Sequence, residues 1–270
     1  MHKRFFIPQV FTMEIRRIFA YRVDFWIQFV GGALAQFLVA WFLWKAVFDY
    51  RQIDRIGAFT FRGMMLYYLL VPFVGRAVRG SEMGGMSEEI YLGTLNRYLV
   101  YPVSFFGFKY TVHLANMLLF LVQGLLTVTV FLLFFNVEGD LSLGPAHVFY
   151  ALSAVFLASF LHFALVSLIQ LTAFWADNVW SLVVIVRFLV GLLGGGMIPL
   201  SLFPKPLEAV LTRLPFAFFM SFPIRCLTGR VDFTAWIEAV MLMTAWLGVF
   251  LLLFATVWNR GKYQYTGVGI

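Results

Sequence analysis

Residues able to do chemistry are few in this chain, and they are scattered. The four histidines, His2, His113, His147 and His162, form no HExxH pair and no closely spaced set of metal ligands. The single cysteine, Cys226, cannot form an internal disulfide and has no histidine near it in sequence. Neither a GxxxxGK[ST] phosphate-binding loop nor a GxSxG nucleophile motif occurs. We therefore expect no metal site and no ATP hydrolysis by the chain itself, with an intramembrane hydrolase or acyltransferase as a minor alternative.

The densest group of polar residues lies between positions 87 and 104, in the stretch SEEIYLGTLNRYLVYPVS. Glu88 and Glu89 begin it, and Gly93 permits a turn. Pro102 then stops any helix before Ser104 caps the next one. Three residues supply an apolar side: Leu95, Tyr98 and Leu99. The pattern predicts a short helix or helical hairpin at a membrane surface, and an ordinary solvated loop is the alternative.

The composition indicates an integral membrane protein. Apolar residues make up 62% of the chain and charged residues 12%, against roughly 45–50% and about 25% in soluble domains. The formal net charge of +7 requires no nucleic acid partner, because basic residues at the inner membrane surface face anionic lipid headgroups. We expect membrane lipid, and no nucleic acid, around this chain.

Apolar segments long enough to cross a bilayer recur along the sequence. A bilayer core needs roughly 20 apolar residues per helix, and spans of this length are helices because only helices and closed barrels satisfy the backbone in lipid. We predict an all-α integral membrane protein with a single domain over residues 23–270 and six spans, at about 23–46, 62–80, 105–135, 146–174, 179–199 and 236–258. The apolar stretch Leu214–Ile224 is too short to span and contains Pro215 and Pro223, which predicts an outer re-entrant or interfacial hairpin.

Residues 1–22 precede the first predicted span and have a different pattern. Four apolar residues after Pro8 share one helical face: Phe11, Ile15, Ile18 and Phe19. Four polar residues fall elsewhere on the helix: Thr12, Glu14, Arg16 and Arg17. The spacing predicts a cytoplasmic amphipathic helix on the membrane surface, and a simple extension of the first span is the alternative.

The distribution of Lys and Arg predicts the orientation. With six spans and both termini on one side, that side holds twelve of the twenty basic residues and the other side eight. The stretch NVEGDLSLG after the third predicted span has two acids and no base. Because cytoplasmic loops carry the excess of basic residues, we expect both termini in the cytoplasm and this acidic loop outside.

Charged residues deep inside the predicted spans would mark an ion path, and they are scarce. Five charged residues in or beside the spans fall within a few turns of a span end: Asp24, Lys45, Asp177, Arg187 and Glu238. The polar residues nearer the middle are neutral or nearly so: Gln28, Gln36, Asn116, Gln123, His162 and Gln170. This inventory argues against a proton-coupled or sodium-coupled carrier.

Glycines gather at the end of the fifth predicted span. Gly194, Gly195 and Gly196 follow Gly191 and precede Pro199. A missing side chain permits either a close approach of neighbouring helices or a flexible helix end. We retain both interpretations, the second being a hinge near an outer gate.

Three parts of the sequence resemble one family. The polar stretch has the pattern E-x-x-x-G-T-L-x-x-x-L-x-x-P-V-S, carried by Glu89, Gly93, Thr94, Leu95, Leu99, Pro102, Val103 and Ser104. Residues 174–223, with the glycine cluster and the IPL, FP and LPF turns, and residues 22–48 agree in order and distance. Together these segments are similar to the permeases of the type-2 export class of ATP-binding-cassette (ABC) transporters.

This resemblance implies a mechanical role for the polar stretch. In that family the first polar loop holds a coupling helix that docks on a cytoplasmic ATPase subunit. The residues implied at or beside this contact are Glu88, Glu89, Gly93, Thr94, Leu95, Asn96 and Arg97, and those implied in a connecting helix are Phe11, Ile15, Arg16, Arg17, Ile18 and Phe19. Many members have a second acid two residues before the glycine, where this chain has Tyr91.

The resemblance also implies partners, location and activity. It implies two ATPase subunits carrying ATP and Mg²⁺, a second permease chain, identical or related, and a place in the bacterial cytoplasmic membrane. The expected activity is export of a hydrophobic or amphipathic substrate, such as a lipid, lipid-linked glycan, drug or peptide, by alternating access. Two alternatives are an ion-coupled secondary carrier, which would need a buried carboxylate, and a membrane assembly or anchoring protein, which would need no route.

Overall fold

The computed structural model describes residues 3–20, 22–80, 85–100, 104–134, 144–176 and 178–265. Within these ranges the chain is mostly helical, with one two-stranded sheet. Several positions used in the sequence argument fall outside the described residues: His2, Pro102, Val103, Asp177 and residues 136–143 of the acidic loop.

Four helices in the described part of the chain are long and apolar enough to cross a membrane. They are α2 (Arg22–Arg51), α6 (Phe105–Phe134), α7 (Pro145–Gln170) and α11 (Phe233–Gly261). Each corresponds to a predicted span within about five residues at either end, because a continuous apolar run fixes the position of such a helix. α7 continues into the 3₁₀ turn η1 (Leu171–Phe174), where the fourth predicted span ends.

The centre of the bundle is α3 (Phe61–Arg79), which packs against α2, α6, α7 and α10. Nearly all of its side chains between Gly63 and Val78 are buried. Against it α7 presents small residues, with Ala154 and Ala158 fully buried, and small side chains let two helices approach closely. Because α3 is surrounded by protein, it tolerates polar residues such as Tyr67 and Tyr68 that a lipid-facing helix would not.

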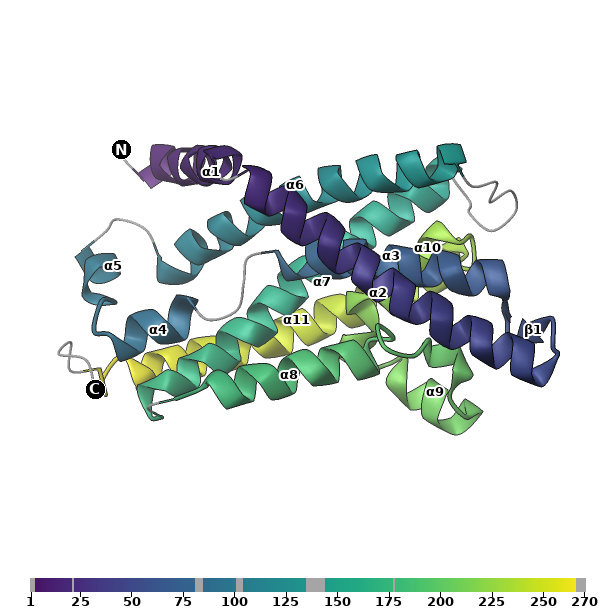
Figure 1. The fold of residues 1–270 in the computed structure, drawn as a ribbon. Helices are drawn as coiled ribbons and strands as arrows, with labels where there is room; N and C mark the ends of the chain where they lie inside the picture. Colours follow the sequence, from purple (N-terminus) through teal and green to yellow (C-terminus); the bar gives the residue numbers. More distant parts are fainter. Residues whose placement is uncertain are drawn as a thin grey trace.

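The remaining elements cap the two ends of the bundle (Figure 1). One end carries α1 (Lys3–Ala20), α4 (Gly85–Tyr91) and α5 (Asn96–Val100), together with the end of α11. We call this the coupling end, after the coupling helix that the sequence resemblance implies there. The opposite end is called the outer end after the orientation predicted from the sequence. It carries the hairpin β1 (Arg55–Ile56) and β2 (Phe59–Thr60), followed by η2 (Leu200–Leu202), α9 (Lys205–Leu211), η3 (Pro215–Phe219) and α10 (Ser221–Leu227).

Side-chain hydrogen bonds cap the first turns of α6 and α3. Ser104 Oγ accepts from the Gly107 amide at 3.1 Å, which confirms the predicted cap of α6. Thr60 Oγ1 does the same for the Gly63 amide at 3.1 Å, at the start of α3. Such caps satisfy amides that have no partner inside the helix.

The fifth predicted span, 179–199, contains a shorter helix. α8 (Trp180–Leu193) has 14 residues, about 21 Å of helix against a bilayer core of about 30 Å. It ends at the glycine cluster, where Gly195 adopts a positive φ of 83°. The helix therefore stops where the backbone turns rather than where the apolar run stops.

Three prolines that the sequence placed at the edges of helical segments lie within helices or 3₁₀ turns. Pro8 lies inside α1, so this helix begins at Lys3 rather than after the proline. Pro215 opens η3, and Pro223 is the third residue of α10. A proline in the first turn of a helix removes an amide that would be unpaired in any case, which explains why Pro223 does not end this segment.

Candidate functional site

The polar stretch folds into two short helices that lie over the ends of the long ones. α4 and α5 are joined by a turn at residues 92–95, and we call residues 85–100 the coupling segment. Its inward side consists of Met86, Ile90 and Leu95, each at most 3% exposed. They pack in one apolar cluster with Phe163 and Phe174 from α7 and η1. Apolar burial therefore fixes the inward face of the coupling segment against the bundle.

Gly93 makes the reversal between α4 and α5 possible. Its φ is 71°, in the region that side chains other than glycine avoid. The Gly93 amide donates to Ile90 O at 3.2 Å, and the Leu95 amide donates to Glu89 O at 3.1 Å. These bonds close the end of α4 and direct Leu95 inward, which is the turn that the sequence predicted.

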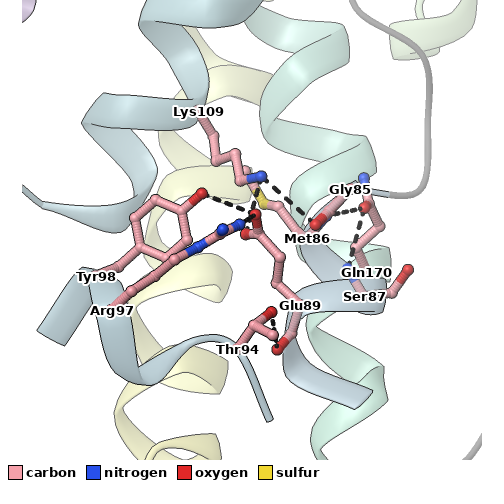
Figure 2. Close-up of polar contacts among 9 residues, drawn as sticks. All are labelled: Gly85, Met86, Ser87, Glu89, Thr94, Arg97, Tyr98, Lys109 and Gln170. Atoms are coloured by element: carbon pink, nitrogen blue, oxygen red, sulfur yellow. Dashed lines mark hydrogen bonds and ion pairs between the residues drawn. The ribbon is translucent and has the colours of Figure 1, made fainter. Parts of the chain in front are cut away.

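The Glu89 carboxylate lies at the centre of a cluster of charged and polar groups (Figure 2). Arg97 pairs with Oε1 at 2.5 Å, and the Tyr98 hydroxyl donates to the same oxygen at 2.7 Å. Lys109 Nζ, from α6, lies 2.9 Å from Oε2. Two cations and a hydroxyl thus satisfy a carboxylate that is only 9% exposed. The cluster joins α4, α5 and α6 through one side chain.

Tyr98 and Lys109 reinforce this cluster through the aromatic ring. The Lys109 ammonium lies 5.5 Å and the Arg97 guanidinium 4.9 Å from the centre of the Tyr98 ring, distances at which cations are attracted to a ring face. Burial and the hydrogen bond to Glu89 raise the pKa of the Tyr98 phenol. The hydroxyl therefore stays protonated and keeps donating to the carboxylate.

A second link joins the start of α4 to α7. Gln170 Oε1 accepts from the amides of Met86 at 2.9 Å and Ser87 at 3.3 Å, and Figure 2 shows this amide facing the helix start. The side chain of one helix therefore caps another. The coupling segment is fixed to α6 through Lys109 and to α7 through Gln170.

The residues predicted at an ATPase contact divide into an outward set and an inward set. Glu88, Thr94, Asn96 and Arg97 are exposed, whereas Glu89, Gly93 and Leu95 are buried. Two exposed neighbours extend the outward set: Tyr91, 38% exposed, and Leu92, 55% exposed. Glu89 therefore lies inside the protein, and we assign it to holding the segment rather than to meeting another subunit.

α1 lies across the coupling end and packs on α6. Of the residues predicted in a connecting helix, Phe11, Ile15 and Ile18 are half-buried, whereas Arg16, Arg17 and Phe19 are exposed. Glu14, which the sequence placed on the polar side, is 8% exposed. It pairs with Arg17 and accepts from Asn116 Nδ2 on α6 at 2.9 Å, so a polar bond contributes to the docking of this helix.

The glycine cluster makes close contacts at the outer end. A Cβ on Gly195 would lie 2.8 Å from Tyr67 Oη, and one on Gly194 would lie 2.9 Å from Phe216 O. Met220 Sδ would be 2.5 Å from a Cβ on Gly196. Pro199 follows at the start of η2 and is buried. These contacts favour the close-approach interpretation of the glycines, and the hinge stays a prediction.

Side chains of catalytic type do not gather elsewhere in the described residues. No three His, Cys, Asp or Glu side chains in the described ranges lie close enough to hold a metal ion. His113 Nε2 shares a 2.7 Å hydrogen bond with Ser159 Oγ. Cys226 is fully buried in α10, and burial raises the pKa of its thiol to about 12, which keeps it protonated and a poor nucleophile.

A comparison with models of protein families identifies the family of this chain. The family model for ABC-2 family transporter proteins matches residues 34–269, which include the coupling segment, the glycine cluster and all helices from α3 to α11. The chain belongs to the ABC-2 transporter family. No curated protein matches it in sequence.

Membership of the ABC-2 family has direct consequences. The chain is a multi-pass membrane protein and a permease component, in agreement with its long apolar helices. ABC-2 permeases associate in general with an ABC ATPase. The sequence pattern does not indicate the roles of three residues at the coupling end: Tyr98 and Lys109, which contact Glu89, and Gln170, which caps α4. The signal available was that a buried acid such as Glu89 needs partners.

Proposed function

We propose that this ABC-2 chain is the permease subunit of an ATP-driven exporter, and that its coupling segment receives motion from a separate ATPase subunit. The observation that carries the proposal is the Glu89 cluster. It fixes a segment with an exposed outer face to α6, while Gln170 fixes the same segment to α7. A push on the exposed face is therefore transmitted to two long helices.

The proposed topology has six spans with both termini in the cytoplasm. α3 and α8 would complete the set begun by the four long apolar helices. α1 and the end of α11 lie at the same end of the bundle as the coupling segment, as an even number of spans requires. The excess of basic residues on that side supports a cytoplasmic location, and α1 would lie along the inner surface of a bacterial cytoplasmic membrane.

The proposed complex contains two ATPase subunits, which bind ATP and Mg²⁺, and two permease chains, identical or related. Apolar residues exposed along α2 and α8, including Leu38, Phe42, Ile185 and Phe188, offer faces for lipid or a second permease chain. The route would run between the permease chains. Its apolar walls would suit a hydrophobic or amphipathic substrate, moved outward by alternating access.

We propose that the ATPase contacts the outward set of the coupling segment: Glu88, Tyr91, Leu92, Thr94, Asn96 and Arg97. Leu92 is the most informative of these, because an apolar side chain 55% exposed beside charged residues gains by being covered in a complex. Tyr91, 38% exposed, adds an aromatic ring to this face.

The test uses Leu92→Asp in the chain co-purified with its ATPase. A carboxylate in a covered apolar contact is costly, so we expect at least a tenfold weaker association with the ATPase. Leu207→Asp is the matched control, since Leu207 is 43% exposed on α9 at the outer end. If Leu92→Asp associates with the ATPase as the parent chain does, or if both variants are weakened equally, the ATPase does not contact this face.

A further inference from the structure

A polar cavity of about 690 Å³ lies behind the coupling segment. Its walls come from α1, α3, α4, α5, α6 and α7, and they include four basic and three acidic side chains. The cavity is large enough for a small charged group together with several water molecules. Nothing in the proposed coupling function uses this space.

Most of the charges on the cavity wall already neutralise one another. Glu14 pairs with Arg17, and Glu89 pairs with both Arg97 and Lys109. Arg79, at the end of α3, is different. Its Nε donates to Gly75 O at 3.1 Å, and no carboxylate among the described residues lies within ion-pair distance of its guanidinium. A positive charge on the cavity wall therefore lacks a counter-ion in the described part of the chain.

Besides Glu89 Oε2, which pairs with Lys109, two deeply buried polar atoms line this cavity without a hydrogen-bond partner among the described residues. They are His162 Nε2 and Ser167 Oγ, on α7, and both residues are 1% exposed. Buried polar atoms in folded proteins are almost always bonded, so each exception calls for an explanation. A serine hydroxyl can donate, and a neutral imidazole donates from one nitrogen. Arg79, His162 and Ser167 line the same cavity, and each can donate a hydrogen bond to an oxyanion.

An apolar cavity lies further along the same three helices. It has a volume of about 240 Å³, and its lining from α3, α6 and α7 has no charged residue. On α6, His113 lines the polar cavity and Phe120 lines the apolar one, a separation of about 10 Å along the helix. The Arg76 guanidinium lies 5.8 Å from the centre of the Phe120 ring. The positive charge of Arg76 therefore lies beside a residue that lines the apolar cavity.

We propose that the polar cavity binds the phosphate group of an anionic amphiphile, such as a phospholipid, whose hydrocarbon chain follows α3, α6 and α7 toward the apolar cavity. Arg79 pairs with the phosphate, because a guanidinium offers two parallel donors to such a group. His162 and Ser167 donate to its remaining oxygens. The site needs no ATPase and no transport to be occupied, so it stands or falls separately from the proposed function.

The test measures binding to the purified full-length chain in detergent by titration calorimetry. Dioctanoyl phosphatidic acid, dioctanoylglycerol and inorganic phosphate are the three probes. We expect phosphatidic acid to bind at least tenfold more tightly than either of the others. Equal binding of dioctanoylglycerol would overturn the phosphate site, and equal binding of inorganic phosphate would retain that site but overturn the amphiphile.

Variants then locate the binding. Arg79→Gln is expected to weaken phosphatidic acid binding at least tenfold. Ser167→Ala is expected to weaken it severalfold with unchanged thermal unfolding, since it removes only an unpaired hydroxyl. Arg213→Gln, exposed at the outer end, is the matched control and should bind as the parent chain does. Equal affinity in Arg79→Gln and Arg213→Gln would contradict the assignment, and Ser167→Ala keeps the test valid if Arg79→Gln unfolds.

Discussion

The coupling end and the outer end of the bundle differ in what holds their short helices. At the coupling end, the Glu89 carboxylate is surrounded by Arg97, Lys109 and Tyr98, and the outer face of the segment is exposed. At the outer end, tyrosine hydroxyls donate to backbone carbonyls. Tyr67 Oη donates to Gly195 O at 2.7 Å, and Tyr68 Oη donates to Met197 O at 2.6 Å.

This difference sets a coupling end with an exposed face against an outer end whose glycine turn is held by neutral hydrogen bonds. The Arg97 side chain is 52% exposed, so water and the charges of another subunit can compete for its pairing with Glu89. Neutral bonds to a buried backbone have no such substitutes, and breaking one leaves a polar atom unsatisfied. We infer that motion enters at the coupling end and that the glycine turn at the outer end keeps its local structure.

Gly195→Ala gives the largest expected effect. The alanine would have to adopt a φ near 83° and place its Cβ 2.8 Å from Tyr67 Oη. The left-handed conformation costs about 1–2 kcal/mol, and overpacking adds roughly 1–3 kcal/mol. We expect the free energy of unfolding, measured by denaturant titration in detergent, to fall by roughly 2–5 kcal/mol.

The matched control for this variant is Gly248→Ala in α11. A Cβ at Gly248 meets no atom within 4 Å, and alanine in a helix interior is more favourable than glycine by about 0.5–1 kcal/mol. Unfolding free energies that change equally in the two variants would show that the glycine turn is not locked.

Tyr98→Phe tests the coupling end with a smaller expected effect. The change removes the hydroxyl that donates to Glu89 at 2.7 Å and keeps the ring beside Lys109 and Arg97. A hydrogen bond to a charged group contributes about 1.5–3 kcal/mol, and we expect the lower part of that range because two cations remain. Tyr263→Phe, at a residue 82% exposed, should leave the unfolding free energy unchanged. A stable Tyr98→Phe variant would mean that the hydroxyl does not help to hold Glu89.

Much of the helical framework could be predicted from the sequence, because long apolar runs determine where helices lie. The bounds of α6 agree with the prediction to within one residue. The end of α8 could not be located from hydropathy, because Gly194 to Gly196 are compatible with an apolar run while their backbone turns. The burial of α3 inside the bundle was equally invisible, since it depends on which helices surround it.

The coupling segment was predictable as a feature, but its internal bonds were not. Gly93, Leu95 and Ser104 carry local signals for turn, burial and cap, and the structure places them accordingly. The inward direction of Glu89 depends on Lys109, which is 20 residues away in sequence, and the burial of Glu14 depends on Asn116 in another helix. Pairings of this kind follow from the tertiary fold rather than from spacing.

If the Glu89 cluster transmits motion, as we propose, Glu89→Gln should weaken the coupling between permease and ATPase. The amide keeps the shape of the side chain but removes the charge that attracts Arg97 and Lys109. The measurement is substrate-stimulated ATP turnover and transport by the reconstituted permease–ATPase complex. Glu208→Gln is the control, because Glu208 pairs with an exposed lysine, Lys205, on α9 at the opposite end of the bundle. We predict that Glu89→Gln still assembles but loses stimulation and transport roughly tenfold, equivalent to about 1.4 kcal/mol, whereas Glu208→Gln retains both. Wild-type stimulation and transport in an assembled Glu89→Gln complex would contradict the account.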